Sequence, residues 1–127
     1  MLRIALGTDD NNILKRERFG DSIQFRIVAI EQGVVVTSEL RPNPFANPAI
    51  ENKPPRILGL LYDCDAFVGR SWRAGSFTLF TENGKKVYLS EMENLHDIIA
   101  AFIRPDYSRL QVFSLERQKF VSAELPQ

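Results

Sequence analysis

The amino-acid sequence predicts an α/β fold of three layers, in which a mixed sheet of about five strands carries helices on both faces. Two observations lead to this fold class. Segments with strand periodicity come first, and strand-like segments then alternate with helix-like ones, an order typical of α/β sheets. A chain of 127 residues with 44% hydrophobic content can also form a core of its own, so residues 1–127 are expected to be a single domain.

The N-terminal third predicts one strand, a polar loop and a hairpin. Leu2, Ile4 and Leu6 alternate with other positions over residues 2–8, which is the period of a strand near the centre of the sheet. Residues 9–22 are too polar and aperiodic to be core, so we expect a loop there. Residues 22–30 and 34–40 predict two strands joined by a tight turn, because Gly33 supplies the positive φ that short hairpin loops need.

A proline-rich crossover follows the hairpin. Residues 41–56 hold five prolines, which excludes regular structure over most of that range. Asn52 is predicted to cap a first helix over 54–62, where prolines in the first turn are tolerated. The short apolar run at 64–69 is typical of a strand that is covered on both faces.

Two more helices are predicted further along the chain. Ser71 as a cap and Gly84 as a stop indicate a second helix over 71–83, and a short strand follows at 85–89. Ser90 and Glu93 form a capping box before a third, amphipathic helix over 91–103. The tail beyond it alternates only in part, which fits either an added strand or a packed extension.

The composition excludes several functional classes. Sixteen basic and sixteen acidic residues cancel, so no net field attracts the chain to nucleic acid or to a membrane surface. A single cysteine excludes an internal disulfide and suits a reducing compartment. Residues 1–8 are too short for a targeting segment, and no apolar run approaches the ~20 residues of a membrane span. A cytoplasmic protein is therefore expected.

Loops at the ends of predicted strands form the candidate binding edge. Ligands of open α/β sheets gather beyond the carboxyl ends of parallel strands, and the loops at 8–22 and 69–75 follow strands that should be parallel neighbours. Arg70 and Arg73 flank Ser71 where the second helix is predicted to begin, a place that favours an anion. The alternative is that both arginines are solvated and that Trp72 is partly buried packing.

Metal and catalytic chemistry have thinner support. Five aspartates could offer oxygen ligands to a magnesium ion, as a nuclease would require: Asp9, Asp10, Asp21, Asp63 and Asp65. Carboxylates in turns more often cap backbone groups, and we favour that reading. Cys64 is expected to be a small buried hydrophobe, and His96 a boundary residue without a nucleophile arranged beside it. No metal site, no catalytic residue and no enzymatic activity are expected.

Several short segments, in their order and spacing, resemble a known family. They read LRIALGTDD, RFGDSIQFRIVAI, NPF and DCDAFVGRSWRAGSFTLFTENGKKVYL, followed by a helix. This pattern resembles the dinitrogenase iron-molybdenum cofactor biosynthesis family over residues 2–103, which leaves 104–127 as a C-terminal extension. The resemblance implies a fold similar to ribonuclease H and a non-enzymatic role in nitrogen fixation, carrying the iron-molybdenum cofactor or an iron-sulfur precursor among cofactor-assembly proteins.

The resemblance also implies where the ligand binds. Phe19 and Gly20 match the family's Phe-Gly pair, and Gly75 matches a glycine at the start of the second helix. Many members have a histidine just before the Phe-Gly, but this chain has Arg18, and residues 70–73 replace a glycine-rich loop. Arginine pairs with an anion but cannot coordinate iron. The sequence therefore predicts a carrier of an anionic cofactor, or a binder of another small anion, that uses Arg18, Phe19, Gly20, Asp21, Ser22, Arg70, Ser71, Arg73 and Gly75. The alternative is a magnesium-dependent phosphodiester enzyme of the ribonuclease H type.

Overall fold

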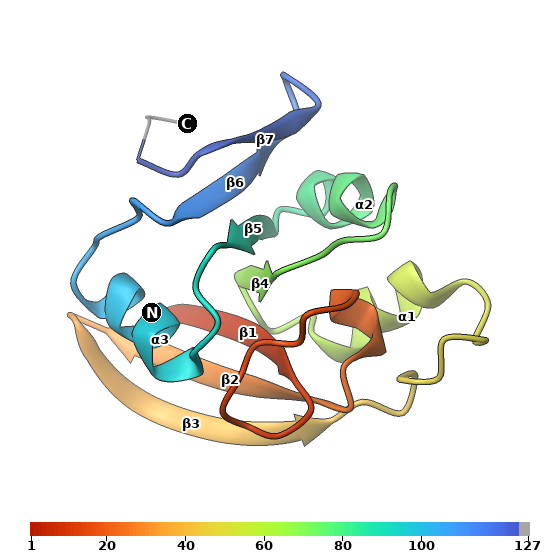
Figure 1. Cartoon of the computed structure of the whole chain (residues 1–127), viewed down its shortest axis with the longest axis horizontal. Helices are drawn as coiled ribbons and strands as arrows, with labels where there is room; N and C mark the ends of the chain where they lie inside the picture. The colour runs from red at the N-terminus through yellow and green to blue at the C-terminus, as the bar shows by residue number, and fades with distance from the viewer. Residues whose placement is uncertain (125–127) are drawn as a thin grey trace.

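A seven-stranded mixed sheet and three α-helices make up residues 1–124, the part of the chain that the computed structural model describes (Figure 1). The strands follow the order β3-β2-β1-β4-β5-β6-β7 across the sheet. Their bounds are β1 (Leu2–Thr8), β2 (Gln24–Glu31), β3 (Val34–Pro42), β4 (Ala66–Gly69), β5 (Lys86–Ser90), β6 (Leu110–Ser114) and β7 (Lys119–Ser122). The helices are the short 3-10 helix η1 (Phe19–Asp21), α1 (Lys53–Leu60), α2 (Ser76–Glu82) and α3 (Leu95–Ile103). No helix in the described part is long and apolar enough to cross a membrane.

Strand direction makes the sheet mixed, as predicted. β4 pairs in parallel with β1 on one side and with β5 on the other, while all other neighbours are antiparallel. β1 lies third in the order, beside the central strand β4, so its predicted place near the centre is confirmed. The turn between β2 and β3 has positive φ at Gln32 and at Gly33, which confirms the role expected of Gly33.

Two hydrophobic cores lie on opposite faces of the sheet. Ile4 and Leu6 of β1 pack with Ile98 and Phe102 of α3 on one face. On the other face, residues of the sheet pack with α1 and α2: Ala5, Phe67, Ile57 and Phe80. Figure 1 shows the same arrangement, with α3 on one side of the sheet and α1 and α2 on the other. The prediction of helices on both faces is therefore confirmed.

The predicted number of strands was too small. The tail that was left open between a strand and an extension supplies two strands, β6 and β7, and raises the sheet from the predicted five to seven. Aromatic packing explains why the tail joins the sheet. The ring centroid of Phe113 of β6 lies 4.5 Å from that of Phe77 and 5.5 Å from that of Phe120. The last three residues of the predicted extension lie outside the described part.

Two helix starts were also predicted wrongly. α2 begins at Ser76, not at Ser71, because Gly75 takes the N-cap position with a φ of 93° while Ser71 pairs with Arg18. α3 begins at Leu95, where the side chain of Asn94 accepts a hydrogen bond from the N–H of His96, so the predicted capping box does not form. The first helix is close to its prediction: Asn52 holds the N-cap position, although its side chain makes no capping bond.

Candidate functional site

The loops after β1 and β4 meet, as predicted from the parallel pairing of these strands. Arg18 and Ser71 form an isolated parallel bridge, in which the N–H of Phe19 donates to the carbonyl of Ser71 over 3.1 Å. The bridge places η1 directly beside the segment that leads into α2. Residues far apart in the sequence therefore share one edge of the sheet, beyond the carboxyl ends of β1 and β4.

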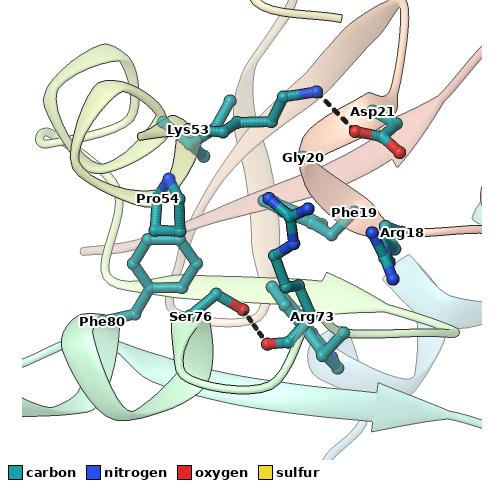
Figure 2. Close-up of a pocket in the computed structure, with 11 residues that line it drawn as sticks. Arg18, Phe19, Gly20, Asp21, Lys53, Pro54, Arg73, Ser76 and Phe80 are labelled. Carbon is teal, nitrogen blue, oxygen red and sulfur yellow. Dashed lines mark hydrogen bonds and ion pairs between the residues drawn. The ribbon is translucent and has the colours of Figure 1, made fainter. Parts of the chain in front are cut away.

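A narrow pocket lies at this edge (Figure 2). Its cavity of about 30 Å³ is enough for one or two water molecules, so a larger ligand would rest at the mouth. Three segments form its wall: η1 with the residue before it, the start of α1, and the segment 72–80. The lining residues are Arg18, Phe19, Gly20, Asp21, Lys53, Pro54, Ile57, Trp72, Arg73, Ser76 and Phe80.

Some charged residues of the pocket form ion pairs and others do not. Arg18 and Arg73 are exposed, and within residues 1–124 neither guanidinium has an ion pair or a hydrogen bond. Lys53 is buried, and its ammonium pairs with Asp21 and donates to the carbonyl of Asn47 over 2.9 Å. Three cations against one carboxylate leave the lining with a formal charge of +2.

An aromatic cluster forms the floor. The ring of Phe19, only 2% exposed, stacks on that of Trp72 with 4.5 Å between the ring centroids. The rings of Trp72 and Phe80 meet edge to face, with 6.1 Å between their centroids. The indole N–H of Trp72 donates to the carbonyl of Tyr88 over 3.1 Å. A Cβ at Gly69 would lie 3.1 Å from the indole, so glycine there lets Trp72 close over β4. The floor is thus fixed by packing and by one hydrogen bond.

The Phe-Gly pair of the first loop has a structural explanation. Phe19 points into the aromatic floor, while Gly20 lies against the stem of Lys53. A Cβ at Gly20 would come within 3.2 Å of Cδ of Lys53 and 3.6 Å of Ile57. Glycine at this position therefore allows α1 to approach η1 closely enough for Lys53 to reach Asp21.

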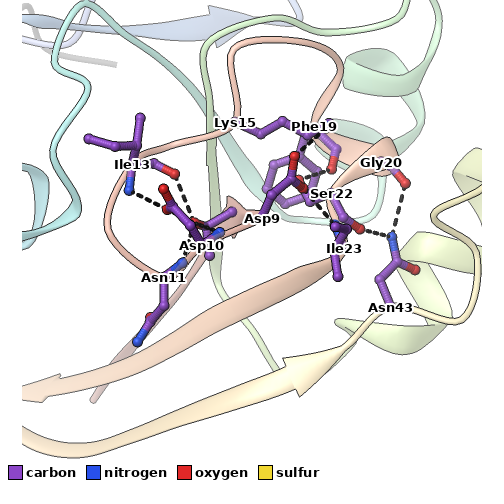
Figure 3. A network of polar contacts seen from close by, with 11 residues as sticks. Asp9, Asp10, Asn11, Ile13, Lys15, Phe19, Gly20, Ser22, Ile23 and Asn43 are labelled. Carbon is purple, nitrogen blue, oxygen red and sulfur yellow. Dashed lines mark hydrogen bonds and ion pairs between the residues drawn. The ribbon is translucent and has the colours of Figure 1, made fainter.

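The rest of the first loop is held by its aspartates (Figure 3). Asp9 accepts from the N–H of Ile23 over 2.9 Å and pairs with Lys15 over 2.7 Å. Asp10 accepts from the N–H groups of Asn12 and Ile13, and these hydrogen bonds lower its pKa. Both carboxylates therefore accept hydrogen bonds from backbone N–H groups of the loop, which is the role that the sequence analysis favoured.

The other aspartates are engaged as well. Asp63 pairs with Arg41 over 2.8 Å, which lowers the pKa of the carboxyl, and Asp65 accepts from the backbone N–H of Arg3. Among residues 1–124 no three side chains of the His, Cys, Asp and Glu types lie close enough together to hold a metal ion.

Five of the nine predicted site residues line the pocket: Arg18, Phe19, Gly20, Asp21 and Arg73. The other four do not, and each has a different place. Ser22 is buried and donates to the carbonyl of Phe19, and Ser71 belongs to the bridge. Gly75 caps α2. Arg70 pairs with Glu93 over 3.1 Å and lines a separate, more open hollow of about 270 Å³.

Sequence reasoning missed the contribution of α1. Lys53, Pro54 and Ile57 come from its first turns. Lys53 was assigned to the proline-rich crossover, and Pro54 and Ile57 to the predicted helix, without a role in the site. Trp72 was noted as packing, and it is both packing and pocket wall. The signal that could have found Lys53 is its charge opposite to Asp21, but 32 positions separate the two residues.

Soft metal ligands lie away from the pocket. Cys64 is fully buried in the core beneath α1, where burial raises the pKa of its thiol to about 12. His96 is exposed on α3, which covers the opposite face of the sheet. Both placements agree with the sequence analysis, and the lining of the pocket contains neither residue type.

Fold and site together define a small α/β domain with a cationic pocket beyond two parallel strands. The chain belongs to the dinitrogenase iron-molybdenum cofactor family, whose family model matches residues 1–104. The family resemblance inferred from the short segments is thereby confirmed, and the family indicates a role connected with a cofactor.

Solved structures share this fold. The apo form of the orange protein from Desulfovibrio gigas has a TM-score of 0.68 at 16% identity, over 83% of this chain and 89% of that one. A Methanocaldococcus jannaschii protein provisionally described as a dinitrogenase has a TM-score of 0.66 at 18% identity, over 89% and 95%. A Thermotoga protein provisionally described as a NifB protein has a TM-score of 0.62 at 25% identity, over 87% and 91%. A comparison with curated proteins found no match.

Proposed function

We propose that this protein is a non-enzymatic binding or carrier domain that holds a small anionic cofactor at the mouth of the pocket. The observation that carries the proposal is the pair of guanidinium groups of Arg18 and Arg73, which line one pocket and have no partner within residues 1–124. Guanidinium groups offer forked donors that suit the oxygens or sulfides of an anion.

Membership of the family supports a cofactor as the ligand. The iron-molybdenum cofactor or an iron-sulfur precursor would be the cargo, and cofactor-assembly proteins in the cytoplasm would be the partners. No thiol or imidazole lines the pocket, so the residues present fit the negative charge of such a cluster and not its metal ions. A cluster bound here would be held by charge-assisted hydrogen bonds. The mixed sheet with helices on both faces is consistent with the ribonuclease H-like fold that the family resemblance implies.

Side chains, and not helix ends, would have to supply the donors. α2 starts at Ser76, whose N–H and hydroxyl both donate to the carbonyl of Arg73. α1 has proline at its second and third positions, Pro54 and Pro55, which lack an N–H. The two free arginines are therefore the main donors at the mouth.

The absence of a catalytic group among the lining residues supports a binding role. The hydroxyl of Ser76 is committed to the carbonyl of Arg73, and the carboxylate of Asp21 to Lys53. Neither has a base beside it that would activate it as a nucleophile.

The test is titration of sulfate, citrate and an iron-sulfur cofactor precursor against the wild type, Arg18→Ala and Arg73→Ala. Trp72 is the only tryptophan and lines the pocket, so its fluorescence reports binding directly. A charge-assisted hydrogen bond contributes ~1.5–3 kcal/mol, so the loss of either arginine should weaken binding by about one to two orders of magnitude.

Arg104→Ala is the matched control, because Arg104 is exposed at the end of α3 on the other face of the sheet. The proposal fails if none of the three ligands binds, or if Arg104→Ala weakens binding as much as Arg73→Ala does.

A further inference from the structure

The ion pair between buried Lys53 and half-buried Asp21 is the feature of the pocket that anion binding alone does not require. Lys53 starts α1 and Asp21 ends η1, so the pair crosses from one wall of the pocket to another (Figure 2). The side chain of Lys53 is 5% exposed and that of Asp21 is 18% exposed. Both charges are shielded from water much more than the two free arginines are.

The partners of Lys53 decide how much positive charge the pocket can offer. An ammonium has three N–H donors. One donates to Asp21 and one to the carbonyl of Asn47, while the stem of Lys53 is held against Gly20. Because Asp21 cancels the charge of Lys53, only Arg18 and Arg73 remain to balance a ligand.

The carboxylate of Asp21 weakens the attraction of the pocket for each negative charge on a ligand. Asp21 lines the same cavity, and its negative charge is part of the field that a bound anion experiences. Interactions between charges in partly buried surroundings are screened less than interactions in open water. The lining keeps a net charge of +2, so a more highly charged ligand is still attracted more strongly, but by less than three free cations would attract it.

We propose that Asp21 is a specificity-determining residue and that its pair with Lys53 limits the preference of the pocket for highly charged anions. This inference rests on the proposed function, since it concerns the ligand of the same site. The chemical class is the small anion or anionic cofactor of the proposed function, for which carboxylates of increasing charge serve as probes. Removal of the charge of Asp21 releases Lys53 as a third cation and shifts the preference toward trianions.

The experiment compares acetate, malonate and citrate, which carry one, two and three carboxylates, by the fluorescence of Trp72. The proteins are the wild type, Asp21→Asn, Lys53→Met and the double variant. The wild type should bind malonate more tightly than acetate, and citrate more tightly than malonate, because the lining has a net positive charge. Asp21→Asn should tighten binding by about threefold per ligand carboxylate, which is about thirtyfold for citrate, the scale of a screened unit charge near a protein surface.

The other two variants test whether the change in affinity follows the sign of the charge removed and whether the two effects add. Lys53→Met should weaken binding with the same dependence on ligand charge, because it leaves Asp21 as a free carboxylate. The double variant removes two opposite charges and should return to within about threefold of the wild type. Asp97→Asn and Lys119→Met, both exposed and outside this pocket, are matched controls for the two charge changes.

The outcomes separate the two proposals. If the wild type binds none of the three anions, no sulfate and no iron-sulfur cofactor precursor, the proposed function fails and this inference falls with it. If it binds the precursor alone, only the specificity role is overturned. If the wild type binds and Arg73→Ala weakens binding, but Asp21→Asn changes all three affinities equally or not at all, only the specificity role is overturned. Urea unfolding checks that each variant is folded, and Asp21→Asn with the double variant decides the matter if Lys53→Met does not fold.

Discussion

Gly7 of β1 lies against Phe19 of η1 and Ser22, and its replacement by alanine should destabilise η1. A Cβ on Gly7 would lie 2.3 Å from Oγ of Ser22 and 3.3 Å from the ring of Phe19. Ordinary contacts at such positions are about 3.5 Å, so Oγ of Ser22 must move by more than about 1 Å. That hydroxyl is buried and donates to the carbonyl of Phe19 over 2.7 Å, so the movement breaks a hydrogen bond at the base of η1.

Two contributions give the expected magnitude. Overpacking of a filled site costs about 1–3 kcal/mol, and the lost hydrogen bond costs about 1 kcal/mol. Gly7→Ala should therefore lower the free energy of unfolding by about 2–4 kcal/mol, measured by urea unfolding with Trp72 fluorescence. Ser22→Ala should cost only about 1 kcal/mol, since the carbonyl of Phe19 keeps the backbone N–H of Ser22 as a donor.

The double variant tests the reasoning. Without the hydroxyl, the nearest atoms to the new Cβ are 3.3 Å away, a distance that small shifts can relieve. The combined loss in Gly7→Ala, Ser22→Ala should be smaller than the sum of the single losses by about 1–2 kcal/mol. Strict additivity, or a Gly7→Ala protein within about 0.5 kcal/mol of the wild type, would refute a steric conflict at Ser22.

Three further predictions concern the aspartates, the buried thiol and the C-terminal strands. Magnesium or manganese with single-stranded or hybrid nucleic acid should leave the substrate intact on a gel, and cleavage that disappears in Asp9→Asn would contradict the turn role of that carboxylate. Burial raises the pKa of Cys64 from 9.0 to about 12. The stabilising contribution of the neutral thiol is therefore full below pH 9 and is lost between pH 9 and about 12, where chemical unfolding should show a decline that Cys64→Ala reduces. Phe113→Ala should cost about 3–5 kcal/mol in urea unfolding, because Phe113 is 5% exposed, and an equal loss in the exposed control Leu115→Ala would contradict it.

The parts of the fold that follow from local apolar patterns could be predicted. Short apolar runs separated by helical segments predict β1 and β4 as parallel neighbours. This pairing correctly predicted that the loops after the two strands lie together. The start of α2 could not be predicted in the same way. Ser71 has the chemistry of a cap, but the bridge with Arg18 uses it, and the cap position passes to a glycine with positive φ. A tertiary contact thus overrode a local preference.

The candidate site also contains residues that the sequence predicts and one that it does not. Arg18 was predicted because it lies in a loop beyond a strand, and Arg73 because it follows a neighbouring strand. Phe19 was predicted because it matches the Phe-Gly pair of the family. Lys53 could not be predicted, because its approach to Asp21 depends on the path of the proline-rich crossover and on the missing side chain of Gly20. Sequence patterns indicate which strands are neighbours, but they do not describe how an irregular loop returns to the sheet.

The parallel pairing of β1 and β4 also has a consequence for when the pocket can exist. The backbone N–H of Arg3 reaches the carboxylate of Asp65 across 62 positions, and the pocket needs residues from η1 to Phe80. Contacts over such separations form slowly, since the loop must close before they stabilise anything. A ribosome must therefore have released well over half of the chain before the pocket can form. During synthesis the pocket is absent until β4 has paired with β1 and the segment up to Phe80 has folded.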